Sequence, residues 1–187
     1  MHTPSPFNSR EFRDVLGRFA TGVTVVTTNG PAGPYGLTAN AFSSLSLDPP
    51  LVLVCVAQGG QSCECIQRNG VFAVNILSAE QGAISQYFAS RDRPRDAAAF
   101  CEIAHRTGDS GAALIDGALA YLDCRLAASH DAGDHIIFIG EVLDLGKSAE
   151  GIPLLFYQGR YRELKTRTST PRKRRRRSPR RAARSRP

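Results

Sequence analysis

Two long apolar segments separated by a short polar turn constrain the fold of this chain most strongly. Residues 119–128 and 135–145 each have the pattern of a long strand, and the segment SHDAGD at 129–134 between them consists of turn-forming residues. A connection this short joins antiparallel neighbours, because parallel strands need a crossover of a dozen or more residues. The pattern therefore predicts a long antiparallel hairpin.

Shorter strand patterns and a few helical segments fill the rest of the chain. β-branched or apolar runs predict strands at 21–28, 51–56 and 71–77, with a short final pair at 153–157 and 159–164. Apolar residues at helical spacing predict helices at 8–20, 61–69 and 80–90, the first capped by Asn8 or Ser9. Strands outnumber helices, so we predict a mainly β protein, an antiparallel β-barrel with a few helices, rather than a doubly wound parallel sheet.

The charge is distributed very unevenly along the chain. The formal net charge is +7, but residues 165–187 hold 12 of the 24 lysines and arginines and none of the 17 acidic residues, which leaves residues 1–164 at −5. The arginine-rich segment is almost devoid of apolar residues, so we predict one domain at 1–164 and a disordered tail at 165–187. The tail is either a tether for nucleic acid or another polyanion, or an extension without function. The acidic domain favours the second interpretation.

The composition also indicates where in the cell the protein is located and whether it binds a metal. No run approaches the ~18 apolar residues of a membrane span, and residues 1–12 have no apolar signal core, so we expect a cytoplasmic protein. The chain has five cysteines, and an odd number favours reduced thiols over a disulfide framework. Cys63 and Cys65 are the pair best spaced for a soft metal, but no second Cys or His cluster completes a zinc site, and we expect no metal.

Familiar catalytic motifs are missing, and polar residues beside strands remain as candidates. The chain has no nucleophile elbow, no Walker loop and no dinucleotide-binding glycine fingerprint. The segment GLTANAFSSLS at 36–46 is dense in hydroxyl and amide groups, which suit an uncharged polar ring edge or a phosphate, or else satisfy the backbone of a bend. His135, at the start of a predicted strand, is either a functional or a structural histidine.

Several segments together resemble the short-chain flavin reductase family, the small reductase partners of two-component flavin monooxygenases. They are FRDVLGRFATGVTVVTT, YGLTANAFSSLSLDPPLVLVCV, GVFAVNIL, ALAYLDC, GDHIIFIGEV and PLLFYQGRY, in this order between Phe12 and Tyr161. The resemblance implies a split β-barrel of the FMN-binding type that binds FMN or FAD. It also implies a homodimer with the flavin near the subunit interface.

The resemblance also implies roles for individual residues. Ser62 matches a hydroxyl that contacts the flavin phosphate, and Arg91 lies where a basic residue approaches that phosphate. His135 matches the histidine that faces the nicotinamide, and Tyr161 is a candidate for the same pocket. The segment that would cradle the flavin ring and ribityl chain is Thr38, Ala39, Asn40, Ala41, Phe42, Ser43 and Ser44. The chain departs from the family in lacking a basic residue before Ser62 and in carrying the arginine-rich tail.

The resemblance leads to a functional hypothesis with two alternatives. It implies an NAD(P)H:flavin oxidoreductase that transfers a hydride from NADH or NADPH to FMN or FAD and supplies diffusible reduced flavin to a monooxygenase. In this hypothesis His135 positions the nicotinamide, while Asp134 shapes the turn or orients His135. The alternatives are a flavin- or haem-binding split barrel without reductase activity, and a polyanion-binding protein that acts through its tail.

Overall fold

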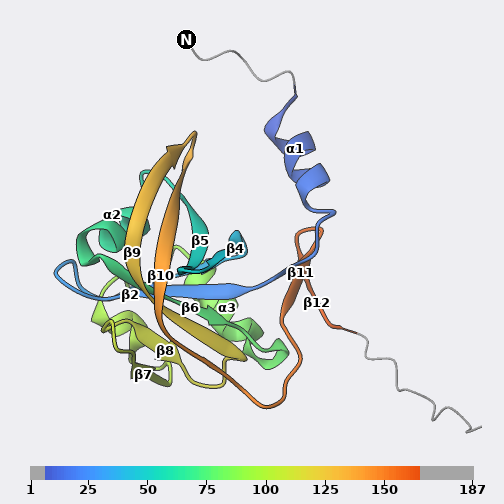
Figure 1. Ribbon diagram of the computed structural model, residues 1–187. Coiled ribbons are helices and arrows are strands. Elements are labelled where there is room, and N and C mark those ends of the chain that lie inside the picture. Colours follow the sequence, from blue (N-terminus) through green and yellow to red (C-terminus); the bar gives the residue numbers. More distant parts are fainter. Residues whose placement is uncertain (1–6, 165–187) are drawn as a thin grey trace, which may run out of the picture.

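The computed structural model describes residues 7–164, which form an antiparallel barrel with three helices (Figure 1). A seven-stranded sheet has the order β3-β2-β6-β9-β10-β5-β4, and smaller sheets are β1-β11-β12 and β7-β8. The strands are β1 (Thr21–Gly22), β2 (Thr24–Thr28), β3 (Tyr35–Ala39), β4 (Phe42–Leu47), β5 (Pro50–Ala57), β6 (Val71–Ile76), β7 (His105–Thr107), β8 (Ala113–Ile115), β9 (Ala120–Ala132), β10 (His135–Lys147), β11 (Leu155–Tyr157) and β12 (Arg160–Arg162). The prediction of a mainly β, antiparallel fold is confirmed.

The helical segments are fewer and shorter than the strands. They are α1 (Ser9–Leu16), α2 (Gln61–Asn69) and α3 (Gly82–Ala89), with 3-10 turns η1 (Ala79–Gln81) and η2 (Ala97–Phe100). The helix predicted at 61–69 is confirmed, and it ends because Gly70 adopts φ +68°. The helix predicted at 80–90 is divided into η1 and α3, since Ser78 and Gln81 form a capping box around η1.

The β9–β10 hairpin is longer and its turn tighter than the sequence predicts. Ala132 pairs with His135, so Gly133 and Asp134 form the whole turn, and the prediction that residues 129–132 belong to it is wrong. Gly133 has φ +70°, a conformation that favours glycine at the first position of a tight hairpin turn. The hairpin rises above the barrel as a long arm (Figure 1) and carries His135 at its tip.

The barrel core is built by alternation along its strands. In β5, Val52, Val54 and Val56 are buried, so the side chains between them point to the outer face. The inward residues pack with Phe72 of β6 and Phe138 of β10, both fully buried. This alternation gives the sheet a second, outer face that is free to form a binding surface.

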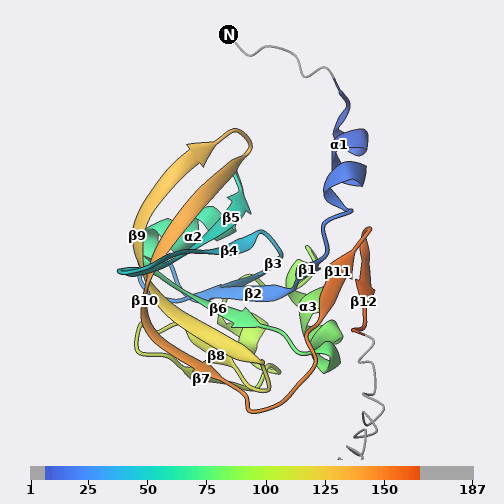
Figure 2. The same ribbon diagram turned by 45° about the vertical axis from the view of Figure 1, so that its right-hand side comes forward.

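A second cluster lies beneath the barrel and supports β3. Phe88 of α3 and Phe100 of η2 pack together with ring centroids 5.4 Å apart. Gly36 of β3 faces both rings, and a Cβ at that position would lie 2.6 Å from the Phe88 ring. The helices therefore hold β3 closely from one side, and Figure 2 shows α3 between the barrel and β11–β12.

Helix α1 stands apart from the barrel (Figures 1 and 2). The Asn8 side chain caps it by accepting a hydrogen bond from Glu11 N at 2.8 Å, and the helix ends at Leu16, before the predicted end at residue 20. The Gln158 N–H, in the β11–β12 turn, donates to Gly17 O at 3.0 Å. None of the residues of α1 is buried, although its apolar side chains follow helical spacing.

Two further sequence predictions concern membrane spans and the arginine-rich tail. No helix within residues 7–164 is long and apolar enough to cross a membrane. The predicted disordered tail at 165–187 lies outside the described residues.

Candidate functional site

A groove of about 920 Å³ lies between α1 and the outer face of the barrel. Its volume lies in the range typical of small-molecule sites. The lining residues are Arg13, Leu16, Gly17, Phe19, Ala20, Thr21, Gly22, Thr24, Asn40, Ala41, Phe42, Ser43, Leu53, Cys55, Ile76, Phe156, Gln158 and Gly159. We refer to this cavity as the groove.

The floor of the groove is the turn between β3 and β4, pinned to β5. The Cys55 N–H donates to Ala41 O at 2.9 Å, and Ser43 pairs with Leu53 across the β4–β5 ladder. Asn40 Nδ2 donates to Thr21 Oγ1 at 3.2 Å, which ties the turn to β1. The turn is therefore fixed by hydrogen bonds on both sides, while its small Ala41 side chain leaves room for a flat ligand.

The structure brings part of the predicted flavin-binding segment into the groove. Asn40, Ala41, Phe42 and Ser43 line it, and the remaining three residues do not. Thr38 Oγ1 donates to Ser85 O at 2.6 Å, Ala39 packs against the barrel core, and Ser44 alternates to the opposite side of β4 from Ser43. Flavin contacts by Thr38, Ala39 and Ser44 stay predictions.

His135 lies on the same outer face as the groove, toward the hairpin tip. In the β5–β10 ladder, Ile137 pairs with Cys55 and His135 pairs with Ala57, so the imidazole and the Cys55 thiol project from one face. His135 Nδ1 and Asp134 Oδ1 are 2.7 Å apart. This hydrogen bond lowers the pKa of Asp134. Because it uses Nδ1, the second imidazole nitrogen, Nε2, takes no part in it. The geometry agrees with a role for Asp134 in orienting His135.

Ser62 and Tyr161 lie outside the groove. Ser62 is in the first turn of α2, whose cap Gly60 offers no side chain, and this helix end is open to an anion. The Tyr161 hydroxyl lies 2.7 Å from Ser85 Oγ, and its ring packs edge-to-face against Phe156, which lines the groove. Tyr161 therefore supports the groove from behind Phe156, and its contact with a nicotinamide stays a prediction.

The segment that contains Arg91 places a different arginine in the protein interior. Arg91 is exposed after α3 and lines none of the cavities described. Arg93 is buried, stacks its guanidinium over Tyr35 and Phe88, and donates to Gly36 O. Arg93 thus clamps β3, the strand that leads into the groove, whereas phosphate contact by Arg91 stays a prediction.

Sequence reasoning missed several groove residues, although signals for them existed. Cys55 alternates with the buried valines of β5, and this pattern places it on the outer face. Arg13 precedes Leu16 and Gly17 by about one helical turn, so it shares their side of α1. Gln158 and Gly159 have positive φ values of 51° and 73° and form the β11–β12 turn, which the Gln-Gly sequence could have indicated.

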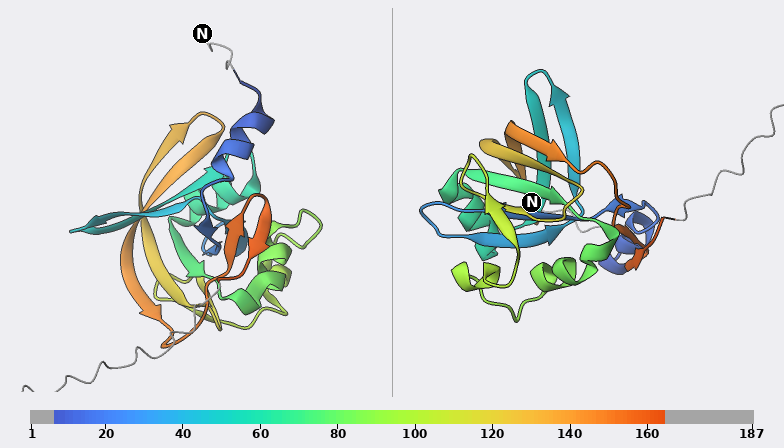
Figure 3. Two further views of the ribbon diagram at one scale, coloured as in Figure 1. Left: turned by 90° about the vertical axis from the view of Figure 1, so that its right-hand side faces the viewer. Right: turned by 90° about the horizontal axis from the view of Figure 1, so that it is seen from below.

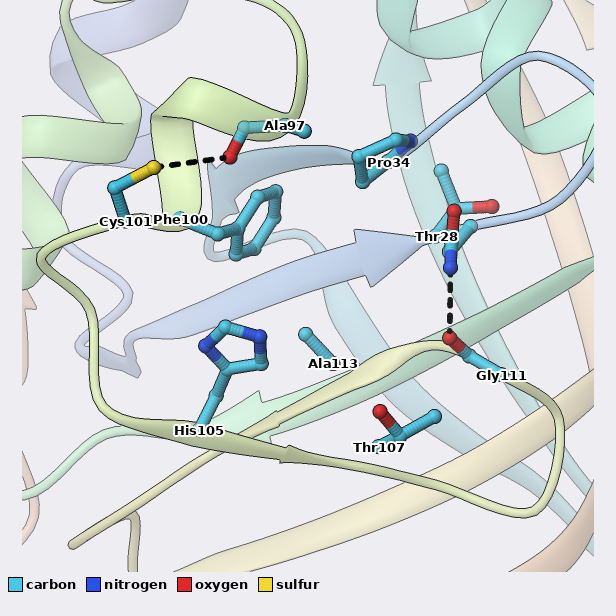
Figure 4. A pocket seen from close by; sticks show the side chains of 10 residues that line it. Thr28, Pro34, Ala97, Phe100, Cys101, His105, Thr107, Gly111 and Ala113 are labelled. Carbon is cyan, nitrogen blue, oxygen red and sulfur yellow. Dashed lines mark hydrogen bonds between the residues drawn. The ribbon is translucent and has the colours of Figure 1, made fainter.

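A second, smaller cavity of about 330 Å³ lies between η2, β7 and the turn after β2 (Figure 4). Phe100, His105, Cys101 and Thr107 point into it from η2 and β7, opposite Thr28 and Pro34. Several of its polar side chains are bonded to the backbone around them: Thr28 Oγ1 donates to Val71 O at 2.7 Å, and His105 Nδ1 lies 2.6 Å from Ile103 O. We refer to this cavity as the lower pocket.

The thiols and the acidic groups offer little other chemistry. Burial raises the pKa of the Cys63 and Cys65 thiols in α2 and raises the pKa of Cys124 to about 12. These thiols are therefore protonated and unreactive near neutral pH. Within residues 7–164, no three His, Cys, Asp or Glu side chains lie close enough together to hold a metal ion.

The fold and the groove define a split β-barrel protein with a site suited to a flat, largely uncharged ring. The family model "Flavin reductase like domain" matches residues 16–165. The chain belongs to this flavin reductase-like family, as its sequence resemblance implied.

Three similar proteins illustrate the family. The chain is 40% identical to the reductase subunit HsaB of a flavin-dependent monooxygenase from Rhodococcus jostii, over 87% of this chain and 81% of that protein. It is 44% identical to the FMN reductase (NADH) SmoA from Agrobacterium fabrum, over 84% of this chain and 87% of that protein. The crystal structure of BorF, the flavin reductase component of a bacterial two-component tryptophan halogenase, matches with a TM-score of 0.81 at 41% identity, over 86% of this chain and 100% of that one.

Proposed function

We infer that the chain is an NAD(P)H-dependent flavin reductase that acts on FMN or FAD. The observation that carries this inference is the position of Asn40, Ala41, Phe42 and Ser43, the core of the family segment, on the floor of the groove. Relatives at about 40% identity are named as reductases of FMN and of FAD with NADH. These names favour NADH as the donor and leave both flavins as acceptors.

The residues of the groove fit a flavin by their chemistry. The floor is apolar or small at Ala41, Leu53 and Cys55, and amide groups stand at Asn40 and Gln158. Such a surface binds a flat ring and hydrogen-bonds its polar edge. The bound flavin supplies the hydride-accepting chemistry, so the protein needs to bind and orient two partners and has no need of a catalytic triad.

We propose that His135 orients the nicotinamide from the hairpin tip. Its side chain is 44% exposed and held by Asp134, which itself is 95% exposed. An imidazole fixed in this way can donate to or accept from a carboxamide group. The proposal requires His135 to affect the binding of the nicotinamide donor rather than that of the flavin. Alignment of two reactants in general lowers the reaction barrier by several kcal/mol.

The apolar side of α1 supports the proposal of a homodimer. Phe12, Val15 and Leu16 of α1 are 48%, 65% and 56% exposed in the single chain, and Phe19, just after the helix, is 76% exposed. Apolar side chains grouped at this exposure mark an interaction surface. We propose that a second copy of the chain covers α1, and Val15→Asp should then convert a dimer into a monomer in analytical ultracentrifugation. A monomeric wild-type protein would refute the proposal.

Release of reduced flavin to a monooxygenase component is the last part of the proposal. One relative is named as the reductase subunit of a flavin-dependent monooxygenase, and another as the flavin reductase component of a two-component tryptophan halogenase. We therefore expect reduced flavin to dissociate and to serve a separate oxygenase.

A turnover assay tests the activity and the release together. The full chain is mixed anaerobically with NADH or NADPH and with FMN or FAD, and the filtrate through a small-pore membrane is examined for reduced flavin. We expect flavin-dependent NADH oxidation and reduced flavin in the filtrate. Flavin binding without NAD(P)H oxidation would instead identify a non-catalytic flavin protein, and reduced flavin retained above the membrane would refute release.

A further inference from the structure

The groove contains a single charged side chain among its described lining residues, and that residue is on α1. Arg13 lines the groove, whereas every other lining residue is apolar, small or neutral and polar. A flavin ring and a nicotinamide ring are largely uncharged, but the nucleotides that carry them are anionic. One cation at the edge of a neutral groove therefore meets the charged part of such a ligand.

The position of Arg13 is fixed by the end of α1. Gly17 N donates to Arg13 O at 2.8 Å, and Gly17 O accepts from Gln158 N at 3.0 Å. Gln158 itself lines the groove, so the last turn of α1 is attached to the groove wall. This attachment keeps the backbone of residue 13 close to the groove that its side chain lines, even though the rest of the helix stands away from the barrel (Figure 3).

Arg13 is available for an external anion. None of the three ion pairs among residues 7–164 includes it, and its guanidinium makes no hydrogen bond to those residues. Its charge does reach the hairpin tip, because the pKa of Asp134 is lowered first by the hydrogen bond to His135 and more weakly by Arg13.

The segment before Ser62 makes an anion contact by Arg13 more valuable. Residues 57–61 read AQGGQ and contain no cation, and Arg95, whose carbonyl accepts from Gln61 at this end of α2, does not line the groove. A phosphate bound near the groove would need its charge balanced from another element. Arginine suits this task because its planar guanidinium donates two parallel hydrogen bonds to phosphate oxygens.

We propose that Arg13 binds a phosphate group of the nucleotide in the groove and so makes the site prefer nucleotides to phosphate-free analogues. The proposal rests on the proposed function, since it presumes that the groove holds the flavin. The phosphate belongs either to the flavin or to the nicotinamide dinucleotide, and both present the same chemistry to a guanidinium.

The test compares ligands with and without phosphate in two variants. Arg13→Gln removes the charge, and Arg10→Gln on the same helix is the control, because Arg10 lines a different surface hollow and not the groove. Glutamine and arginine have similar helix propensity, so α1 is preserved. Flavin fluorescence gives dissociation constants for FMN and riboflavin. Steady-state rates compare NADH with 1-benzyl-1,4-dihydronicotinamide, which has no phosphate.

If Arg13 holds the flavin phosphate, Arg13→Gln weakens FMN binding about tenfold and changes riboflavin binding less than about twofold, as expected for one charge-assisted hydrogen-bonded contact. If it holds the dinucleotide, the KM for NADH rises about tenfold with riboflavin as acceptor, and the KM for the benzyl donor is unchanged. Arg10→Gln changes neither the FMN dissociation constant nor the KM for NADH.

Three results would overturn the proposal: equal effects on ligands with and without phosphate, no effect of Arg13→Gln, or the same effect in Arg10→Gln. A wild-type protein that reduces no flavin would refute the proposed function, while the binding measurements would still report on Arg13.

Discussion

The groove and the lower pocket show how differently two cavities of one small barrel are equipped for binding. The groove measures about 920 Å³ on the outer face, and the lower pocket about 330 Å³ between η2, β7 and the turn after β2. Both combine apolar walls with a few polar side chains. Volume alone would make either a candidate for a small ligand.

The two cavities differ in which polar side chains make no hydrogen bond to the described residues. In the lower pocket, Asn29 Nδ2 donates to Gly111 O at 3.2 Å, and His105 contacts Ile103 O. In the groove, the side chains of Arg13 and Gln158 make no hydrogen bond to the described residues. The longer polar side chains of the lower pocket thus bond to the fold, while the groove retains a guanidinium and an amide for a ligand.

Filling each cavity gives the largest expected difference between them. Cys55→Trp places an indole in the groove from the outer face of β5, and we expect FMN binding to weaken by about a hundredfold, roughly 3 kcal/mol for an overfilled site. Isothermal titration calorimetry with FMN measures this effect.

The matched control for the filled groove is Cys101→Trp in the lower pocket. Cys101 is exposed and lines that pocket, so the variant should keep the FMN dissociation constant of the wild type. If Cys101→Trp abolishes FMN binding and Cys55→Trp does not, the assignment of the two cavities is reversed.

His135→Ala tests whether the hairpin tip serves the nicotinamide. We expect the KM for NADH to rise about tenfold, the loss of one hydrogen bond, with FMN affinity nearly unchanged. Steady-state kinetics and flavin titration give the two numbers. A parallel loss of flavin affinity and of thermal stability would instead show that His135 is a structural residue.

Tyr161→Phe should give the smallest effect, and on stability rather than on substrate. The change leaves the fully buried Ser85 without its hydroxyl partner, which destabilises the fold by about 1–2 kcal/mol. Urea denaturation measures this loss, and the KM for NADH should be unchanged. A raised KM at normal stability would support the direct nicotinamide contact that the family resemblance implies.

The long strands β5, β9 and β10 were more predictable from the sequence than the ends of the helices, and no strand was predicted at β3, β4, β7 or β8. Apolar alternation identifies β5 because one face of the strand fills the core. Residues 129–132 were assigned to a turn because they are polar, yet they pair with the start of β10 in an exposed arm where no burial selects apolar residues. Phe19 extends the apolar pattern of α1 past its end, because helical spacing does not reveal where Gly17 turns the chain toward the barrel.

Only part of the candidate site could be predicted, because a groove gathers elements that are distant in the sequence. The β3–β4 turn was found through its local polar pattern and the family resemblance. Arg13 and Gln158 reach the groove through the contact between α1 and the β11–β12 turn, which no local pattern encodes. Thr38 is the opposite case. The sequence predicts that its hydroxyl binds the flavin, but in the structure this hydroxyl donates to Ser85 O.

Thiol alkylation tests the central claim, that flavin occupies the groove and not the lower pocket, without any mutation. Cys55 lines the groove and Cys101 the lower pocket, while Cys63, Cys65 and Cys124 are buried with raised pKa values and should react slowly. The full chain is treated with iodoacetamide at pH 8 with and without FMN, and modification at each cysteine is followed by peptide mass spectrometry. The account predicts that saturating FMN slows the alkylation of Cys55 about tenfold or more and leaves the rate at Cys101 unchanged. Protection of Cys101, or equal rates at Cys55 with and without FMN, would contradict it.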